Sequence, residues 1–292
     1  MPLPLDPNPQ FEQYAHPERL VSASWLSARL GTPGLRVVES DEDSLLYDIG
    51  HIPGAVRIDW AKDLNDPQIR DYIDAEAFSE LMSRKGIARD DTVVVYGDKS
   101  NWWAAFTLWI FELFGHEDVR ILDGGRDAWM AEERDTSFAV PEYGPTAYEV
   151  AKREDTPSRI FVQEICERRN DLQLIDVRSA EEYAGLPNRE YPSAPVSRFG
   201  HIPGARNISW EYSTHANGRF RSIEELKATF ADISQDDDIV VYCQVGERAA
   251  HSWFVLKYLL GYPTVRSYDG GWVEWGNMVR MPVAIGVEES SS

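Results

Sequence analysis

The chain has 292 residues, and its 43% of hydrophobic residues, with ten tryptophans, can supply the cores of two domains. Its formal net charge of −20 disfavours nucleic acid and anionic membrane surfaces as partners, because binding to either needs clustered Lys and Arg. No apolar run approaches the roughly 20 residues of a membrane span, and the N-terminus lacks the basic start and apolar core of a secretion signal. We therefore expect a cytoplasmic protein that binds neither nucleic acid nor membranes.

Strand-like runs alternate with helix-like runs along the chain, which is the pattern of α/β domains built on parallel sheets. The predicted strands, in chain order, are residues 35–39, 93–96, 120–122, 172–177, 239–242 and 266–268. A polar, Pro-containing stretch separates the two groups of strands. The predicted organisation is a tail at 1–19, a first domain at 20–134, a linker at 135–158, a second domain at 159–285 and a tail at 286–292.

The two groups of strands belong to an internal repeat. The pentapeptide His-Ile-Pro-Gly-Ala at 51–55 recurs at 201–205, and Asp-Gly-Gly at 123–125 recurs at 269–271. Repeats of about 150 residues are whole domains, too long to be the units of a solenoid. The sequence therefore predicts two domains of the same fold.

The residues that could perform chemistry lie in the second half. Cys243 follows the predicted strand 239–242, and a helix-like run at 249–260 comes after a short loop. Unpaired N–H groups and the helix dipole favour an anion in such a loop, so we expect the thiol pKa to fall from about 8.5 toward neutrality. The alternative is that Cys243 is a buried small hydrophobe at the end of a strand. The aligned residue of the first half is Gly97, so only the second domain can carry a thiol nucleophile.

The remaining candidate residues have simpler interpretations. Cys166 lies on a helix-like pattern and is predicted to serve packing rather than chemistry. The six histidines lack the spacings typical of a zinc site, and we predict no metal. We expect His51 and His201 to be structural, because one of them lies in the half without the nucleophile.

The second half also contains an insertion around residues 187–192, before its His-Ile-Pro-Gly-Ala pentapeptide. This segment of the chain carries Arg189 and Arg198, which are candidates to line the rim of an active site. A solvated surface loop is an equally good interpretation for either arginine taken alone.

Taken together, the motifs resemble those of the tandem-domain rhodaneses, closest to the actinobacterial thiosulfate sulfurtransferases. They are the duplicated Gly-His-Ile-Pro-Gly-Ala, Asp176-Val-Arg178, the Cys-Gln-Val-Gly-Glu-Arg loop that starts at Cys243, and Asp-Gly-Gly-Trp-Val-Glu-Trp at 269–275. The resemblance covers nearly the whole chain, from about Leu20 to Val283. It implies an α/β fold with two rhodanese-like domains, each a five-stranded parallel sheet flanked by helices, and an inactive first domain.

The resemblance also implies a mechanism. The Cys243 thiolate would take the outer sulfur of thiosulfate, release sulfite and pass the persulfide sulfur to cyanide or a thiol in a ping-pong cycle. No cofactor beyond this covalent persulfide is expected. The loop that would hold the outer sulfur consists of Gln244, Val245, Gly246, Glu247, Arg248 and Ala249. Six residues from Cys to Arg suit a single sulfur, whereas the longer phosphatase loop forms a wider cradle.

Supporting roles can be assigned to the charged residues near this loop. We expect Arg248 to brace the loop through a carboxylate such as Asp176 or Glu247. Asp176 and Arg178 would support the loop or form an ordinary strand-end ion pair. Some family members carry cationic side chains where this chain has Val245 and Glu182. The second negative charge of thiosulfate would then be met by Arg178, Arg189 or Arg198.

Three other functions compete with thiosulfate sulfurtransferase. A 3-mercaptopyruvate sulfurtransferase uses the same chemistry, but its loop usually carries a small polar residue that Gln244 and Val245 do not match. A persulfide carrier would hand its sulfur to an acceptor protein. A cysteine phosphatase is disfavoured by the short loop. The expected partners are therefore a small-molecule sulfur donor and a thiophilic acceptor, which for a persulfide carrier would be an acceptor protein.

Overall fold

The computed structural model describes residues 3–150, 152–186 and 195–286. The chain forms two compact units. The first comprises Met1–Glu154 and Thr214–Phe220, and the second comprises Asp155–Ser213 and Arg221–Ser292. The short segment 214–220 therefore follows the start of the second repeat in sequence and yet packs with the first unit.

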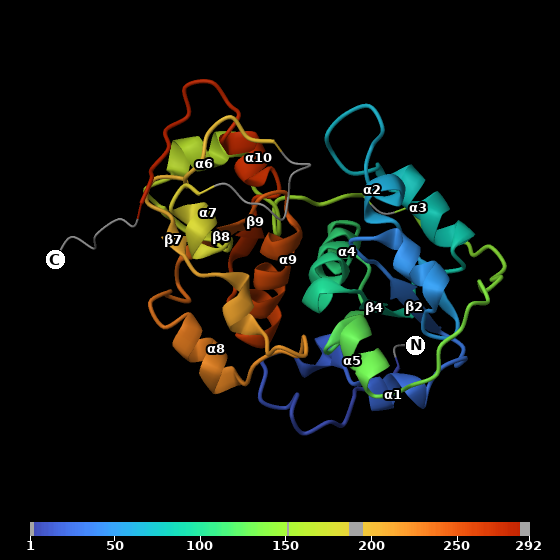
Figure 1. Ribbon diagram of the computed structural model, residues 1–292. Coiled ribbons are helices and arrows are strands. Elements are labelled where there is room, and N and C mark those ends of the chain that lie inside the picture. Colours follow the sequence, from blue (N-terminus) through green and yellow to red (C-terminus); the bar gives the residue numbers. More distant parts are fainter. Residues whose placement is uncertain (1–2, 151, 187–194, 287–292) are drawn as a thin grey trace. The chain divides into compact units, whose positions relative to one another are not determined.

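The first unit is built on a five-stranded parallel sheet in the order β1-β5-β4-β2-β3. Figure 1 labels β2 and β4 of this sheet, with α4 beside them. The strands are β1 (Leu20–Val21), β2 (Leu35–Glu39), β3 (Ala55–Arg57), β4 (Thr92–Tyr96) and β5 (Val119–Leu122). The helices are η1 (Pro17–Arg19), α1 (Ala23–Ser27), η2 (Ser44–Ile49), α2 (Trp60–Asp63), α3 (Ala75–Arg84), η3 (Lys99–Asn101), α4 (Trp102–Leu113) and α5 (Gly125–Ala131). The predicted α/β class is confirmed for this half.

The second unit repeats this plan with four strands in the order β7-β6-β8-β9, again all parallel. The strands are β6 (Leu172–Asp176), β7 (Arg206–Asn207), β8 (Asp238–Tyr242) and β9 (Val265–Ser267). The helices are α6 (Val162–Arg168), α7 (Ala180–Tyr183), η4 (Trp210–Ser213), α8 (Ile223–Thr229), α9 (Glu247–Phe254), the π-helical η5 (Val255–Leu259) and α10 (Gly271–Trp275).

Over the part of the second domain that the structure describes, the sheet has four strands, so the prediction of five in each domain is corrected there. The counterpart of β1 is reduced to a single parallel bridge between Arg159 and Ser267. The Arg159 side chain forms a bidentate ion pair with Asp269 (2.9 and 3.0 Å). One bridge supplies too few ladder hydrogen bonds to make a strand.

The sheet of the second unit buries apolar residues on both faces, as parallel sheets do. One core cluster joins Val162 and Ile165 of α6 to Trp272 of α10 over Val240 of β8. Since neighbouring side chains on a strand point to opposite faces, the alternate residues of β8 face α9. Helix α9 packs along β8 and β9 (Figure 1), and Trp253 Nε1 donates to the carbonyl of Val265 at 3.0 Å. This bond ties the end of α9 to the start of β9.

Two local predictions are corrected. The helix predicted at 249–260 begins two residues earlier, as α9, and its last part is the π-helical η5. Cys166 lies on α6 as expected, but its side chain is exposed, so it does not serve packing. Among the described residues, no helix is long and apolar enough to cross a membrane.

Candidate active site

Cys243 lies directly after β8, in the short loop that leads into α9. Gly246 turns this loop with φ of 122°, a conformation that favours glycine, and Glu247 begins the helix. The Gly246 N–H donates to Cys243 Sγ at 3.1 Å. The side chain of Cys243 is fully buried, so the sulfur lies among backbone N–H groups and away from solvent.

The expected lowering of the thiol pKa is wrong for this site. Burial, together with the charge of Glu247, raises the pKa of the Cys243 thiol to about 12, although Arg248 and the N–H groups of Ala249 and Gly246 act in the opposite direction. The sequence argument counted the helix N-terminus and omitted the loss of water around the sulfur and the neighbouring carboxylate. At neutral pH the resting site therefore holds a thiol.

Arg248 braces the loop from a buried position between two carboxylates. Its Nη1 and Nη2 atoms donate to the two oxygens of Glu182 at 2.7 and 3.2 Å, and its Nε lies 3.3 Å from Glu247 Oε1. Although burial alone would raise the pKa of Glu182, the hydrogen bonds and charge of Arg248 lower it. Glu182 is also the N3 residue of a capping box with Ser179 at the start of α7. Helix α7 therefore anchors the loop.

The carboxylate partners of Arg248 differ in part from those expected from the sequence. Glu247 is a partner of Arg248 as expected, but Asp176 is not, because it pairs with Arg178 instead. Glu182, where the family resemblance implied a cation in some members, uses its carboxylate to hold Arg248.

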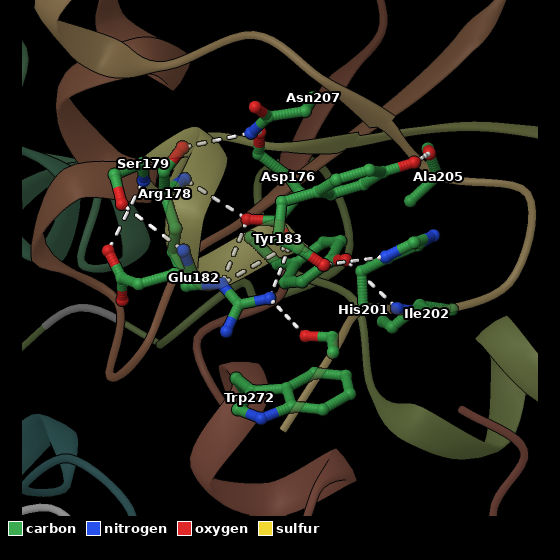
Figure 2. A network of polar contacts seen from close by, with 12 residues as sticks. Asp176, Arg178, Ser179, Glu182, Tyr183, His201, Ile202, Ala205, Asn207 and Trp272 are labelled. Carbon is green, nitrogen blue, oxygen red and sulfur yellow. Dashed lines mark hydrogen bonds and ion pairs between the residues drawn. The ribbon is translucent and has the colours of Figure 1, made fainter. Parts of the chain in front are cut away.

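Asp176 and Arg178 form a buried ion pair at the end of β6 (Figure 2). Arg178 Nε lies 2.9 Å from Asp176 Oδ1, and Nη2 also donates to the carbonyl of Gly200 at 2.8 Å. The guanidinium carbon is 4.8 Å from the centre of the Trp272 ring, within the range of a cation–π contact. The ion pair thus positions the first turn of α10.

Helix α10 completes the support of the loop from the other side. The backbone N–H groups of Trp272 and Val273 donate to the carbonyls of Cys243 (2.9 Å) and Gln244 (3.1 Å). A Cβ on Gly271 would lie 2.7 Å from the Gln244 carbonyl oxygen and 2.9 Å from that of Cys243. This role of Gly271 was not predicted from the repeated Asp-Gly-Gly motif. The pattern that could have indicated it is a glycine directly before a helix with two tryptophans.

The two repeated histidines have structural positions. His201 Nδ1 lies 2.8 Å from the Tyr183 carbonyl oxygen, and the two rings stack with centres 3.5 Å apart (Figure 2). His51 repeats this arrangement with Tyr47, at 2.9 Å and 3.8 Å. Both histidines are buried, and each side chain hydrogen-bonds to the backbone of its own domain.

Of the two arginines predicted to line the rim of the active site, only Arg198 lies within the described residues. Arg198 donates to backbone carbonyls at the end of α10 and after it, those of Trp275, Gly276, Met278 and Met281. Its guanidinium is therefore occupied in holding that turn. Arg189 lies outside the described residues. Among the residues that are described, no group of three or more His, Cys, Asp or Glu could hold a metal ion.

Comparison with known proteins agrees with this geometry. A model of the rhodanese-like domain matches residues 22–132 and residues 162–278. The chain belongs to the rhodanese family. It is 66% identical over 291 residues to a thiosulfate sulfurtransferase of Corynebacterium glutamicum, covering 98% of this chain and 97% of the relative. The recognition of a tandem rhodanese made from the sequence is therefore confirmed.

Two further relatives extend the comparison. The sulfur carrier protein TtuD of Thermus thermophilus is 50% identical over 286 residues, covering 94% of this chain and 99% of the relative. Among solved structures, the anaerobic ergothioneine biosynthesis enzyme of Chlorobium limicola matches with a TM-score of 0.80 and 26% identity, over 94% of this chain and 72% of that chain.

The first rhodanese domain carries a different loop at the position of Cys243. Gly97 replaces the cysteine, and a Cβ there would lie 2.1 Å from the carbonyl oxygen of Ser40. The residues that follow, Lys99, Ser100 and Asn101, all have positive φ. The Asn101 side chain accepts the Gly97 N–H at 3.0 Å. The Asn101 side chain and the Ser40 backbone therefore occupy the space that a side chain at position 97 would need.

Proposed function

We propose that this rhodanese is a thiosulfate sulfurtransferase that carries sulfane sulfur as a persulfide on Cys243. The observation that carries the proposal is the position of the Cys243 sulfur, which accepts the Gly246 N–H in a loop clamped by Arg248. Backbone N–H groups arranged in this way stabilise a localised anion without reorganising during the reaction. The full-length identity to a thiosulfate sulfurtransferase supports thiosulfate as the donor.

The reaction proceeds in two half-reactions. In the first, the Cys243 sulfur bonds to the outer sulfur of thiosulfate, the sulfur–sulfur bond of the donor breaks, and sulfite leaves with the bonding electrons. In the second, cyanide or a thiolate bonds to the outer sulfur of the persulfide, and Cys243 leaves as a thiolate. A reducing, cytoplasmic compartment would keep Cys243 available for this cycle.

Charge at the site bears on the choice of donor. Arg178 is paired with Asp176, and Arg198 is occupied by backbone carbonyls. Arg248 is shared by two carboxylates. We therefore expect modest catalytic efficiency with the dianion thiosulfate. Nothing at Gln244 or Val245 supplies the small polar side chain that would favour 3-mercaptopyruvate.

A persulfide carrier is the second candidate, and the identity to the sulfur carrier protein TtuD favours it specifically. In this role the same Cys243 persulfide would pass to an acceptor protein instead of cyanide. The two candidates share the first half-reaction and differ in the acceptor, so turnover and persulfide occupancy must be measured together.

The test measures steady-state sulfur transfer to cyanide with thiosulfate and 3-mercaptopyruvate side by side, together with intact mass. Cys243→Ser is the blank, and Cys166→Ser is the matched control, because it removes the exposed thiol. The proposal expects faster turnover with thiosulfate, a mass gain of about 32 Da for one sulfur, and loss of both in Cys243→Ser.

Two other results would change the assignment. Faster Cys243-dependent turnover with 3-mercaptopyruvate, with pyruvate as the product, would move the protein to that branch. A stoichiometric Cys243 persulfide with negligible turnover on either donor would assign it as a carrier. If turnover persists in Cys243→Ser, the thiosulfate, 3-mercaptopyruvate and carrier assignments are all contradicted.

A further inference from the structure

A second titratable group lies against the Cys243 sulfur. Glu247 Oε2 is 3.6 Å from Cys243 Sγ, and the Glu247 side chain is fully buried. Its other oxygen, Oε1, lies 3.3 Å from Arg248 Nε. A glutamate in the first turn of a helix is favoured by the dipole, but that preference is met at the surface and does not require burial against a thiol.

The charges around the sulfur disfavour a Cys243 thiolate beside an ionised Glu247. Arg248 is the cation of the cluster, and the carboxylates of Glu247 and Glu182 already face it. A Cys243 thiolate beside an ionised Glu247 would add a second negative charge without water. Burial raises the pKa of Glu247, and burial together with Glu247 raises that of Cys243. The two buried groups therefore oppose each other's ionisation, and the hydrogen bond between Cys243 Sγ and Glu247 Oε2 gives a proton a direct path from the sulfur to the carboxylate.

Other proton acceptors in the neighbourhood are occupied or unsuitable. Glu182 accepts both Nη atoms of Arg248, and Asp176 is paired with Arg178. Burial lowers the pKa of His251, on the next turn of α9, to about 3. Within residues 3–150, 152–186 and 195–286, Glu247 is the titratable side chain that accepts a hydrogen bond from the Cys243 sulfur.

We propose that Glu247 is a catalytic residue that accepts the Cys243 proton as the sulfur donor is attacked and returns it when the persulfide is discharged. This assignment rests on the proposed sulfurtransferase function and deepens it. The sulfur is fully buried, so a base already in contact with it can take its proton without bulk water.

The steps balance in protons and electrons. The proton moves from Cys243 Sγ to Glu247 Oε2, which turns a thiol and a carboxylate into a thiolate and a neutral acid. The thiolate displaces sulfite from thiosulfate and leaves an anionic persulfide, held by Arg248 and the loop N–H groups. Cyanide removes the outer sulfur as thiocyanate, and the released thiolate recovers its proton from Glu247.

The experiment measures single-turnover sulfur uptake from thiosulfate by rapid quench and intact mass, from about pH 5 to about pH 9. The variants are Glu247→Gln and Glu247→Asp, and the control is Glu224→Gln, an exposed glutamate on α8. In the wild type we expect uptake to level off once Glu247 is ionised. In Glu247→Gln we expect at least about a hundredfold slower uptake at neutral pH, rising about tenfold per pH unit.

A purely electrostatic or structural role makes the opposite prediction. The neutral Gln removes the like charge that raises the thiol pKa, so a Glu247 that only repels the thiolate would make uptake faster in Glu247→Gln. Unchanged or faster uptake with a wild-type pH profile would overturn the assignment. Glu247→Asp keeps a carboxylate, and we expect a slower reaction with the wild-type pH profile.

The outcomes separate this inference from the function on which it rests. Wild-type uptake at Cys243 with an unaffected Glu247→Gln would overturn the role of Glu247 and leave the sulfurtransferase assignment in place. A wild type that takes no sulfur from thiosulfate would overturn both. If Glu247→Gln does not fold, the pH profile of Glu247→Asp decides, since a merely structural role predicts no carboxylate-dependent plateau.

Discussion

At the scale of single residues, Gly271 holds the start of α10 against the loop that carries Cys243. Its φ of 56° is unfavourable for any other residue, and an added Cβ would press on the carbonyls of Cys243 and Gln244 at 2.9 and 2.7 Å. We predict that Gly271→Ala costs about 2 kcal/mol in the free energy of unfolding and displaces the loop, so that sulfur transfer falls sharply.

Thermal unfolding and steady-state sulfur transfer measured on the same preparation would test this prediction. The matched control is Gly144→Ala, because Gly144 is exposed and a Cβ there meets nothing within 4 Å. The control should change stability by less than about 0.5 kcal/mol. An active, stable Gly271→Ala would show that the loop does not depend on close approach of α10.

A second residue-scale prediction concerns the fork of Arg248. Lysine keeps the charge but cannot donate to both oxygens of Glu182 and to Glu247 at once. We predict that Arg248→Lys lowers the free energy of unfolding by about 2 kcal/mol, as expected for lost hydrogen bonds between charged buried groups. Urea unfolding measures this, with Arg168→Lys as the control.

The control differs in burial rather than in chemistry. Arg168 also contacts two carboxylates, Glu164 and Asp238, but its side chain is 41% exposed, and such pairs are worth about 0–1 kcal/mol. Equal losses in the two variants would mean that Arg248 contributes only a surface-like ion pair.

The residue scale also shows where sequence reasoning reached its limit. Cys243, its loop and Gly246 were predicted from the strand, loop and helix pattern, and the structure places them together. The sign of the thiol pKa shift was not, because it depends on burial and on the carboxylate of Glu247, both set by packing. The sequence indicated only that Glu182 stands where some family members have a cation. Its ion pair with Arg248 could not be predicted, because the two residues are 66 positions apart in the sequence.

At the scale of elements, the two domains use the same scaffold with different side chains. Arg126 of α5 donates to the Gly50 carbonyl, and Arg178 after β6 donates to that of Gly200. Each guanidinium also pairs with the acid that ends the neighbouring strand, Glu39 or Asp176. In each domain a guanidinium therefore bridges the glycine carbonyl and the strand-end carboxylate, but it comes from a different element. An alignment of the two halves cannot reveal this equivalence.

The strands illustrate which elements the sequence could predict. The six predicted runs correspond to β2, β4, β5, β6, β8 and β9, within a residue or so at each end. Short edge strands such as β1 and β7 have two residues each, too few to show a periodic pattern. Whether such a strand forms depends on its pairing with a strand that is distant in sequence. For the same reason, the sequence could not predict that the counterpart of β1 in the second sheet makes only one bridge.

The same comparison predicts that the first domain cannot be given a nucleophile by one substitution. Gly97→Cys places a Cβ 2.1 Å from the Ser40 carbonyl oxygen, in a loop already closed by Asn101. We predict a loss of about 2 kcal/mol in stability and no second persulfide after incubation with thiosulfate. Intact mass in a Cys243→Ser background measures the persulfide, and Gly97→Ala should show the same loss of stability. A persulfide in that background would contradict the prediction.

At the scale of the whole molecule, the backbone passes between the two units at residues 154–155, 213–214 and 220–221. The segment Thr214–Phe220 is thus a loop from the second repeat that is part of the first unit. Its Phe220 N–H donates to the buried Asp123 carboxylate at 3.0 Å. A contact that joins the two repeats in this way could not be predicted from either one.

Asp123 makes that contact dependent on pH. Burial raises its pKa from 3.8 to about 6, although the Phe220 N–H and Arg219 favour the charged form. A carboxyl group whose pKa is raised on folding stabilises the fold fully below its unfolded pKa. That contribution is lost as the pH rises through the folded value. The affected window therefore runs from about pH 4 to about pH 6.

Asp123→Asn should remove this dependence, because an amide can still accept the Phe220 N–H through its oxygen but never ionises. Relative to the wild type, we predict that the variant gains up to about 3 kcal/mol of stability between pH 4 and pH 7. Urea unfolding of both proteins across this range measures the difference. Asp127→Asn, at an exposed position on α5, is the control and should follow the wild type. If the difference between Asp123→Asn and the wild type stays constant with pH, Asp123 is ionised throughout, and its bond to Phe220 holds the segment with a full charge.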